Sequence, residues 1–253
     1  MIIEALEHKI DIESVNCLWP DYKNLESEFR NYSGTNIKHA NQILDQILER
    51  EEKECLEALF FGDNGWYRRI DGNGMILLKL AAINLGITND IFAFDSQKEE
   101  KILERVERIP EDLQLLVMRC YLKQKLITYL TLCNYLQNIK KDDKMVLTLY
   151  RGINTPYDYD NTSYIHTGLE SWTTSIDSAY KFARKNGYVI EKEYPISQIF
   201  ISPRSSFKNI KNRKLRNNGF YVRREHEIIV ENNLNIYEYK EHQIYLVSDR
   251  EVV

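Results

Sequence analysis

"MVLTLYRGI", which runs from Met145 to Ile153, is the stretch at which the character of the chain changes. From here to the C-terminus, short segments rich in Ile, Val and Tyr alternate with a period of two, which is typical of β-strands. One helix interrupts them, "SIDSAYKFARKNG", with Ser175 or Asp177 as its cap and Gly187 at its end. The other strand-like segments are "GYVIEKEYPIS" (187–197), "QIFISP" (198–203), "REHEIIVE" (224–231), "LNIYEYKEH" (234–242) and "QIYLVSD" (243–249).

The residues before Lys144 predict helices instead, because their apolar positions follow the helical period. Pro110, followed by two acidic residues, marks the start of one long helix or two shorter ones. The predicted helical segments are 36–61, 75–86, 96–109 and 110–139. We therefore expect an α+β protein with a helical N-terminal region at 1–109 and a second unit at 110–253, made of helices at 110–140 and a β-rich core at 144–250.

The bulk composition is that of an ordinary globular protein of 253 residues, with 43% hydrophobic residues, 28% charged residues and a net charge of −4. No apolar run is long enough for a membrane span, and the N-terminus lacks the basic start and cleavage site of a signal peptide. The four cysteines form no CxxC pair and the five histidines are scattered, so the sequence predicts neither a metal site nor a disulfide framework. We expect a cytoplasmic protein, or one delivered into a target cell by a route that leaves no visible signal peptide.

Three short motifs follow one another in the second unit. The first is Tyr150-Arg151-Gly152 at a strand end, the second is Thr173-Thr174-Ser175 directly before a helix, and the third is Glu225-His226-Glu227 at the start of a strand. Each has an ordinary explanation on its own: a surface charge, a helix cap and a solvated strand face. Their occurrence together, in this order and on these elements, favours a functional site.

In this order the motifs resemble the R-S-E class of mono-ADP-ribosyltransferases, which includes bacterial toxins, phage enzymes and vertebrate ectoenzymes. The resemblance covers roughly residues 110–250 and leaves the helical region before it unexplained. It implies a core of two small, mostly antiparallel sheets around a cleft for NAD. NAD is then the substrate, and the reaction needs no metal.

The resemblance also implies a role for each motif residue. Arg151 anchors the diphosphate, to which a guanidinium makes bidentate charge-assisted bonds, and Gly152 lets the backbone approach the nicotinamide carboxamide. Glu227 is the catalytic carboxylate that stabilises the oxocarbenium-like state. Thr173 stands where the family has the serine that orients this glutamate, and it keeps the hydroxyl. Thr174 and Ser175 complete the cofactor-binding motif.

Two further residues are candidates for binding the cofactor. Arg184 and Tyr188 lie at the end of the helix after the second motif, where related enzymes contact the phosphates and stack on nicotinamide. On the same helix we expect Phe182 to be a core residue, and we expect Trp172 to pack beneath the site.

Glu225 precedes Glu227 on the same strand face, since residues two apart in a strand share a face. In relatives that modify arginine this first position is Glu, so the resemblance favours a protein arginine as the acceptor. A strongly basic loop precedes the motif, and its last residues are candidates for acceptor recognition: Phe220, Tyr221, Arg223 and Arg224. Such a loop favours an acidic face on the target protein, or a nucleic acid; a solvated loop that only balances charge is the other explanation.

The expected function is therefore transfer of ADP-ribose from NAD to a macromolecule, by a toxin, an effector or a phage host-takeover enzyme. ADP-ribosylation of nucleic acid, plain NAD hydrolysis and a non-enzymatic interaction module that kept the fold remain open alternatives. The N-terminal helices can guide target choice, bind a neutralising partner or buttress the cleft.

Overall fold

The structure, a computed structural model, describes thirteen stretches or single positions of the chain: residues 48–61, 66, 72–85, 87, 104–105, 107–134, 136, 145–157, 163–165, 168–201, 227–232, 236–238 and 243–246.

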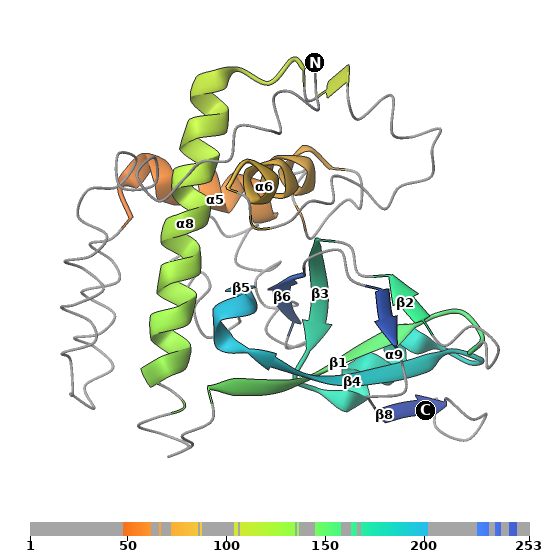
Figure 1. Cartoon of the computed structure of the whole chain (residues 1–253). Helices are drawn as coiled ribbons and strands as arrows, with labels where there is room; N and C mark the ends of the chain where they lie inside the picture. Colours follow the sequence, from red (N-terminus) through yellow and green to blue (C-terminus); the bar gives the residue numbers. More distant parts are fainter. Residues whose placement is uncertain are drawn as a thin grey trace.

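Along the described chain three helices precede the strands, and a fourth helix lies between the third and fourth strands (Figure 1). The helices are α5 (Arg50–Phe61), α6 (Asn73–Asn84), α8 (Glu111–Asn134) and α9 (Ile176–Ala183). The strands are β1 (Val146–Ile153), β2 (Ser163–Ile165), β3 (Leu169–Thr173), β4 (Tyr188–Pro195), β5 (Ile199–Ile201), β6 (Glu227–Glu231), β7 (Ile236–Glu238) and β8 (Gln243–Leu246). The mixed α+β class expected from the sequence is confirmed, and the long helical segment after Pro110 is one helix.

The strands form a six-stranded sheet in the order β5-β6-β3-β1-β4-β8 and a two-stranded pair, β2-β7. Every strand pairing that the structure describes is antiparallel. The long pairing in the sheet joins β1 to β4 along their whole length. By contrast, β1 meets β3 at one pair only, Tyr150 opposite Thr173. Figure 1 shows β3 descending steeply toward β1 and β4 and meeting them at its end, so the sheet bends sharply at this pair.

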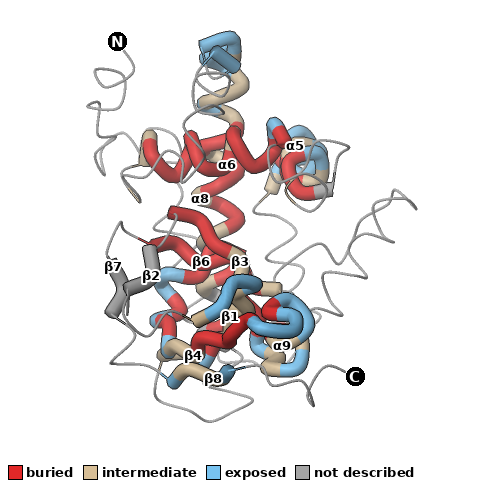
Figure 2. The backbone as a smooth tube through the Cα atoms, turned by 90° about the vertical axis from the view of Figure 1, so that its right-hand side faces the viewer, coloured by how far each residue is buried: buried red, intermediate tan, exposed pale blue. Residues whose placement is uncertain are grey.

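One hydrophobic core joins the helical half to the sheet. It contains Phe60 of α5, Tyr121 of α8 and Phe200 of β5, and the Tyr121 and Phe200 rings stack with centroids 4.0 Å apart. Figure 2 shows α6 and the middle of α8 buried along most of their length, continuous with buried stretches of the sheet. The described part of the N-terminal region therefore packs on the β-rich part rather than standing apart from it.

A second core lies on the other face of β1, β3, β4 and β6. Trp172 is buried there, with its ring edge-on to Tyr194 at 5.0 Å between centroids. Its place beneath a functional site stays a prediction. The indole Nε1 of Trp172 donates to the buried carboxylate of Glu170, which also accepts from Asn232 Nδ2. These bonds satisfy the polar groups that the core would otherwise leave without partners.

Candidate active site

The candidate site lies where β3 crosses β1, because that crossing brings residues of three adjacent strands together. Tyr150 pairs with Thr173, and Thr173 pairs with Glu227. Directly opposed residues in antiparallel strands point to the same face. Each of the three sequence motifs thus contributes one residue to a single row, and Arg151 follows Tyr150 on β1.

A chain of two hydrogen bonds links Arg151 to Glu227. Arg151 Nη1 donates to the backbone oxygen of Ser171 at 2.6 Å, and Ser171 Oγ donates to Glu227 Oε1 at 2.5 Å. Short bonds of this kind are expected when one partner is ionised. The Arg151 guanidinium therefore fixes the backbone of Ser171, and the Ser171 side chain fixes the Glu227 carboxylate.

The sequence does not single out Ser171, and the family resemblance implies Thr173 as the orienting hydroxyl. Both residues lie on the same face of β3, two positions apart. Thr173 is buried, and its Oγ1 accepts a hydrogen bond from Ser175 N at 3.0 Å. That bond shapes the turn into α9. A part for Thr173 in the reaction stays a prediction.

The other residues of the second motif start a helix. Ser175 is the N-cap of α9, and its side chain accepts from Ser178 N at 3.2 Å. Thr174 is exposed. Contact of either residue with NAD stays a prediction, whereas the cap is a common reason for serine at this position.

Gly152 lies directly beneath α9. A Cβ at this position would stand 2.0 Å from Ala179 O and 2.6 Å from Ala183 N, so only glycine lets the helix backbone come so close. The sequence assigned Gly152 to the nicotinamide carboxamide, and that contact stays a prediction beside the packing role.

The end of α9 carries a strained residue. Arg184 is exposed and has φ 57° and ψ −175°, a region that glycine almost alone populates. Tyr188, at the start of β4, is buried and its ring is edge-on to Tyr157 at 5.2 Å between centroids. Contact of either residue with NAD stays a prediction.

The prediction that Phe182 belongs to the core is wrong: the residue is 55% exposed. The reason is the narrow contact of α9 with the sheet. The helix buries only its small residues Ala179 and Ala183, which lie over Gly152, and Phe182 follows on the outer side.

Polar side chains extend the site across the sheet. Glu191 pairs with Tyr150 on one side and with Gln243 on the other, so the row from Glu227 continues on the same face as far as β8. Tyr245 OH donates to Glu191 at 2.8 Å, and this bond raises the pKa of Tyr245 to about 12. Burial, followed by the charge of Glu191, raises the pKa of Tyr150.

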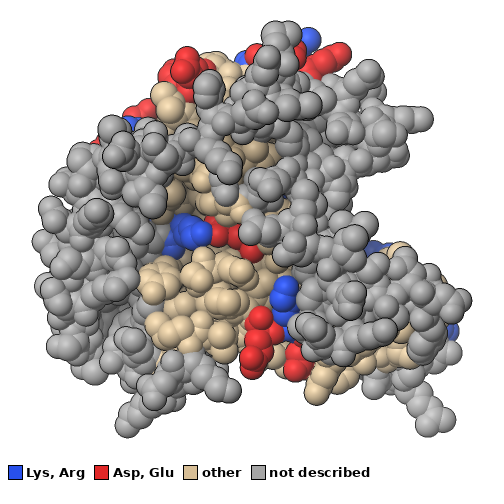
Figure 3. Space-filling view, in the orientation of Figure 1, with Lys and Arg blue, Asp and Glu red and all other residues tan. Residues whose placement is uncertain are grey.

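The acceptor-side candidates Glu225, Phe220, Tyr221, Arg223 and Arg224 lie outside the described residues, and so does the basic loop that contains four of them. Among the described residues, no three His, Cys, Asp or Glu side chains gather as metal ligands would. No helix in the described ranges is long and apolar enough to span a membrane. Figure 3 shows acidic and basic side chains close together in the middle of one face, beside an uncharged surface.

The arrangement supplies an oriented carboxylate, that of Glu227, with the Ser171 hydroxyl as a donor to one of its oxygens. The two strands that carry these residues, β6 and β3, contribute to both hydrophobic cores. Such a carboxylate can stabilise a positive charge that develops nearby, or accept a proton from a nucleophile. No family model, curated protein or solved structure matches this chain when it is compared with them.

Proposed function

We propose that the protein is a mono-ADP-ribosyltransferase that moves ADP-ribose from NAD to a macromolecular acceptor and releases nicotinamide. The observation that carries this proposal is the hydrogen-bonded chain from Arg151 through Ser171 to Glu227. Arginine, serine and glutamate, in this order along the sequence, stand on three adjacent strands and are joined side by side. They are also the three residue types that give the R-S-E class its name.

In the proposed reaction, the bond between the nicotinamide nitrogen and C1′ of the ribose breaks, and the bonding electrons leave with nicotinamide. Positive charge develops on C1′ and the ring oxygen, and the Glu227 carboxylate stabilises it. An acceptor nucleophile then attacks C1′ and loses its proton. Ser171 contributes by holding Oε1 of Glu227, so that the carboxylate is oriented before the substrate arrives.

Arg151 has two tasks in this proposal. Its Nη1 holds the Ser171 backbone oxygen, which fixes the position of β3 beside β1. Its positive charge attracts the diphosphate of NAD toward the same point. Because both tasks use one guanidinium, replacement by lysine removes the planar fork that serves them together.

For the acceptor, we propose an arginine on an acidic face of a protein. The argument is the residue type of Glu225, two positions before Glu227 in the sequence, together with the basic composition of the segment before it. A carboxylate at that position can orient a guanidinium and take its proton as it attacks.

The test is the release of nicotinamide from NAD by the purified full-length protein, measured by chromatography. We expect release by the wild type, and a fall of about 100-fold or more for Glu227→Gln, because the amide carries no negative charge. Glu193→Gln is the matched control, since Glu193 is an exposed carboxylate on β4 outside the bonded chain. Equal rates for the wild type and Glu227→Gln would overturn the proposal.

A further inference from the structure

The packing of α5 on α8 brings two cysteine thiols together, and the proposed reaction uses neither. Cys55 on α5 is half-buried and Cys120 on α8 is fully buried. Cys120 belongs to the core between the two helices, and Cys55 packs against that core.

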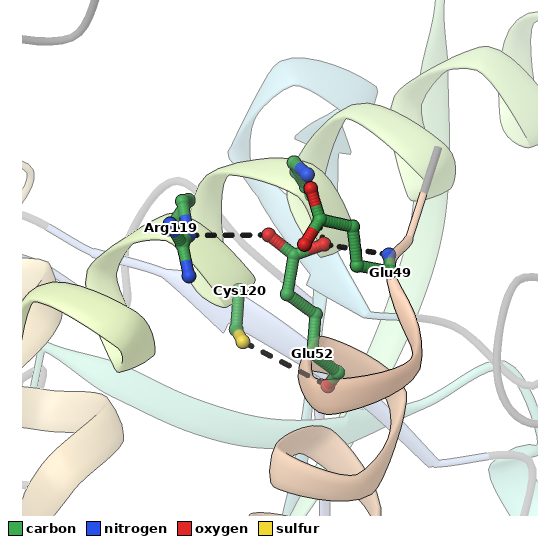
Figure 4. Close-up of polar contacts among 5 residues, drawn as sticks. Glu49, Glu52, Arg119 and Cys120 are labelled. Atoms are coloured by element: carbon green, nitrogen blue, oxygen red, sulfur yellow. Dashed lines mark hydrogen bonds and ion pairs between the residues drawn. The ribbon is translucent and has the colours of Figure 1, made fainter. Parts of the chain in front are cut away.

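The two thiols lie beside the same turn of α5, Cys55 by its position on the helix and Cys120 by a hydrogen bond to it. Cys120 Sγ donates to Glu52 O at 3.7 Å, as Figure 4 shows. Glu52 lies one turn before Cys55, so residues 52 and 55 share a face of the helix. Cys55 packs against the core that contains Cys120, so both thiols lie at this turn of the contact between α5 and α8.

Ion pairs hold this part of the helix pair in register. The Glu52 carboxylate is fully buried and contacts Lys123 Nζ at 2.8 Å and Arg119 Nε at 3.2 Å, both on α8. It also accepts from Glu49 N at 2.8 Å. Figure 4 shows the carboxylate between α5 and the side chain of Arg119. The contacts of Glu52 and of Cys120 thus hold one turn of α5 against one turn of α8.

From this juxtaposition we propose that Cys55 and Cys120 are a site of oxidative modification, and that they form a disulfide between α5 and α8 when the protein meets a peroxide or a small-molecule disulfide. The proposal does not depend on the proposed enzymatic function.

The two thiols differ in a way that sets the order of the steps. The neighbouring Cys120 side chain lowers the pKa of the Cys55 thiol. The pKa of Cys120 is raised, first by the Cys55 side chain and then by burial. Because thiolate is the reactive form, the more exposed Cys55 reacts first.

With a peroxide, the Cys55 thiolate attacks one oxygen of the O–O bond, which becomes the oxygen of a sulfenic acid, and the other oxygen leaves as water after protonation. The Cys120 sulfur then attacks the Cys55 sulfur, the S–S bond forms and the second water leaves. Two thiols and one peroxide thus give one disulfide and two waters. With glutathione disulfide, the same attack gives a mixed disulfide, and Cys120 then displaces glutathione.

The experiment uses the full-length protein, treated with hydrogen peroxide, quenched, alkylated in denaturant and cleaved after lysine. Cleavage puts Cys55 in peptide 54–79, Cys120 in peptide 102–123 and Cys133 in peptide 126–140, so mass spectrometry distinguishes the possible crosslinks. We expect a crosslink between peptides 54–79 and 102–123 that dithiothreitol removes. We also expect the oxidised protein to unfold at higher urea than the reduced protein, because the crosslink restricts the unfolded chain.

Two variants provide the controls. In Cys120→Ser, glutathione disulfide should leave Cys55 as a stable mixed disulfide, whereas the wild type should lose the glutathione to the internal disulfide. Replacement of Cys17 and Cys133 by serine should leave the crosslink unchanged. Alkylated Cys55 and Cys120 after peroxide, oxidation of Cys55 to a sulfinic acid, or crosslinks between molecules would each overturn the proposal.

Discussion

At the scale of single residues, the account depends most on Ser171. Replacement by alanine removes the donor to Glu227 Oε1 and leaves the strand pairing intact. We expect nicotinamide release to fall about 100-fold, which is a typical effect of removing one preorganised hydrogen bond. Threonine at this position keeps the hydroxyl and should recover most of the rate.

Thr173 provides the comparison for Ser171. Valine at Thr173 removes the acceptor for Ser175 N at the start of α9, so we expect a loss of about 1 kcal/mol in the free energy of unfolding. We expect a smaller effect on the rate than for Ser171→Ala. A larger rate loss in Thr173→Val than in Ser171→Ala would return the orienting role to Thr173.

Tyr245 offers a prediction on pH dependence. Its pKa is raised to about 12, first by the hydrogen bond to Glu191, because the phenolate would stand against that carboxylate. A raised folded-state pKa stabilises the fold below the unfolded value near 10, and the stabilisation disappears as pH rises through the folded value. The difference in ultraviolet titration between the wild type and Tyr245→Phe isolates this tyrosine from the others, and Glu191→Gln should lower its midpoint toward 10.

Some residues of the candidate site can be selected from the sequence and others cannot. Arg151 and Glu227 could be selected as candidates because each lies in a short motif at the end or the start of a predicted strand. Ser171 could not, because the choice between it and Thr173 depends on which hydroxyl reaches Glu227 across two strands. The sequence gives only a weak indication, because residues 171 and 173 lie on the same strand face and either hydroxyl could orient Glu227.

At the scale of elements, α9 packs closely on β1 because Gly152 has no side chain at the point of contact. A methyl group there would collide with the backbone of Ala179 and Ala183. We expect Gly152→Ala to lower the free energy of unfolding by about 3 kcal/mol, at the upper end for an overpacked contact. Urea unfolding followed by circular dichroism measures this, and wild-type stability in the variant would contradict the packing described for α9.

A buried ion pair connects the long helix to the strand that carries Glu227. At the far end of β6, the Glu231 carboxylate is buried, accepts from Tyr121 OH at 2.7 Å and pairs with Lys125 Nζ, both on α8. Lys125→Met should destabilise the fold by about 2–3 kcal/mol, because it leaves a buried carboxylate without its cation.

The control for this pair is an exposed one. Arg50 and Glu54 form an i,i+4 ion pair on α5, with side chains that are 92% and 65% exposed. Arg50→Met should leave the free energy of unfolding close to that of the wild type, because water and salt screen an exposed pair. Equal effects of Arg50→Met and Lys125→Met in thermal unfolding would mean that the buried pair contributes nothing specific.

The hydrophobic period in the sequence predicts most of the helices and strands, but it does not predict how they pack. The period-two pattern predicted β1, β4, β5, β6 and β8, and the helical period predicted α6 and α8. β3 shows no such pattern, because its five residues with one tryptophan are too few to establish a period of two. The exposure of Phe182 does not follow from the sequence, because the pattern of α9 does not show that the helix buries only two alanines.

At the scale of the whole molecule, the helical half and the sheet share one core through α5, α6, α8 and β5. We therefore expect one cooperative unfolding transition for the full chain. A fragment that starts at Pro110 would expose Tyr121, Phe200 and Ile201, which the missing helices cover. We expect it to aggregate, or to melt well below the full chain by differential scanning calorimetry. A fragment as stable as the full chain would contradict the shared core.

The sequence predicted the α+β class and the change near residue 145, because the hydrophobic period switches there from helical to alternating. It could not predict that α5 and α6 pack on α8 and share a core with the sheet, since contacts between segments so far apart leave no local pattern. Nor could it predict the single-pair crossing of β1 and β3, which depends on sheet twist and brings the candidate site together.

The most direct test of the account uses NAD labelled on the adenylate phosphate. Purified protein is incubated with this NAD and a bacterial lysate, beside Glu227→Gln and the Glu193→Gln control, and each sample is divided between protease and nuclease. We predict labelled macromolecules with the wild type and with Glu193→Gln, none with Glu227→Gln, and label that survives nuclease but not protease. Label lost to nuclease would instead indicate a nucleic-acid acceptor. Undiminished labelling by Glu227→Gln, or no labelled macromolecule and no nicotinamide release with the wild type, would contradict the central claim.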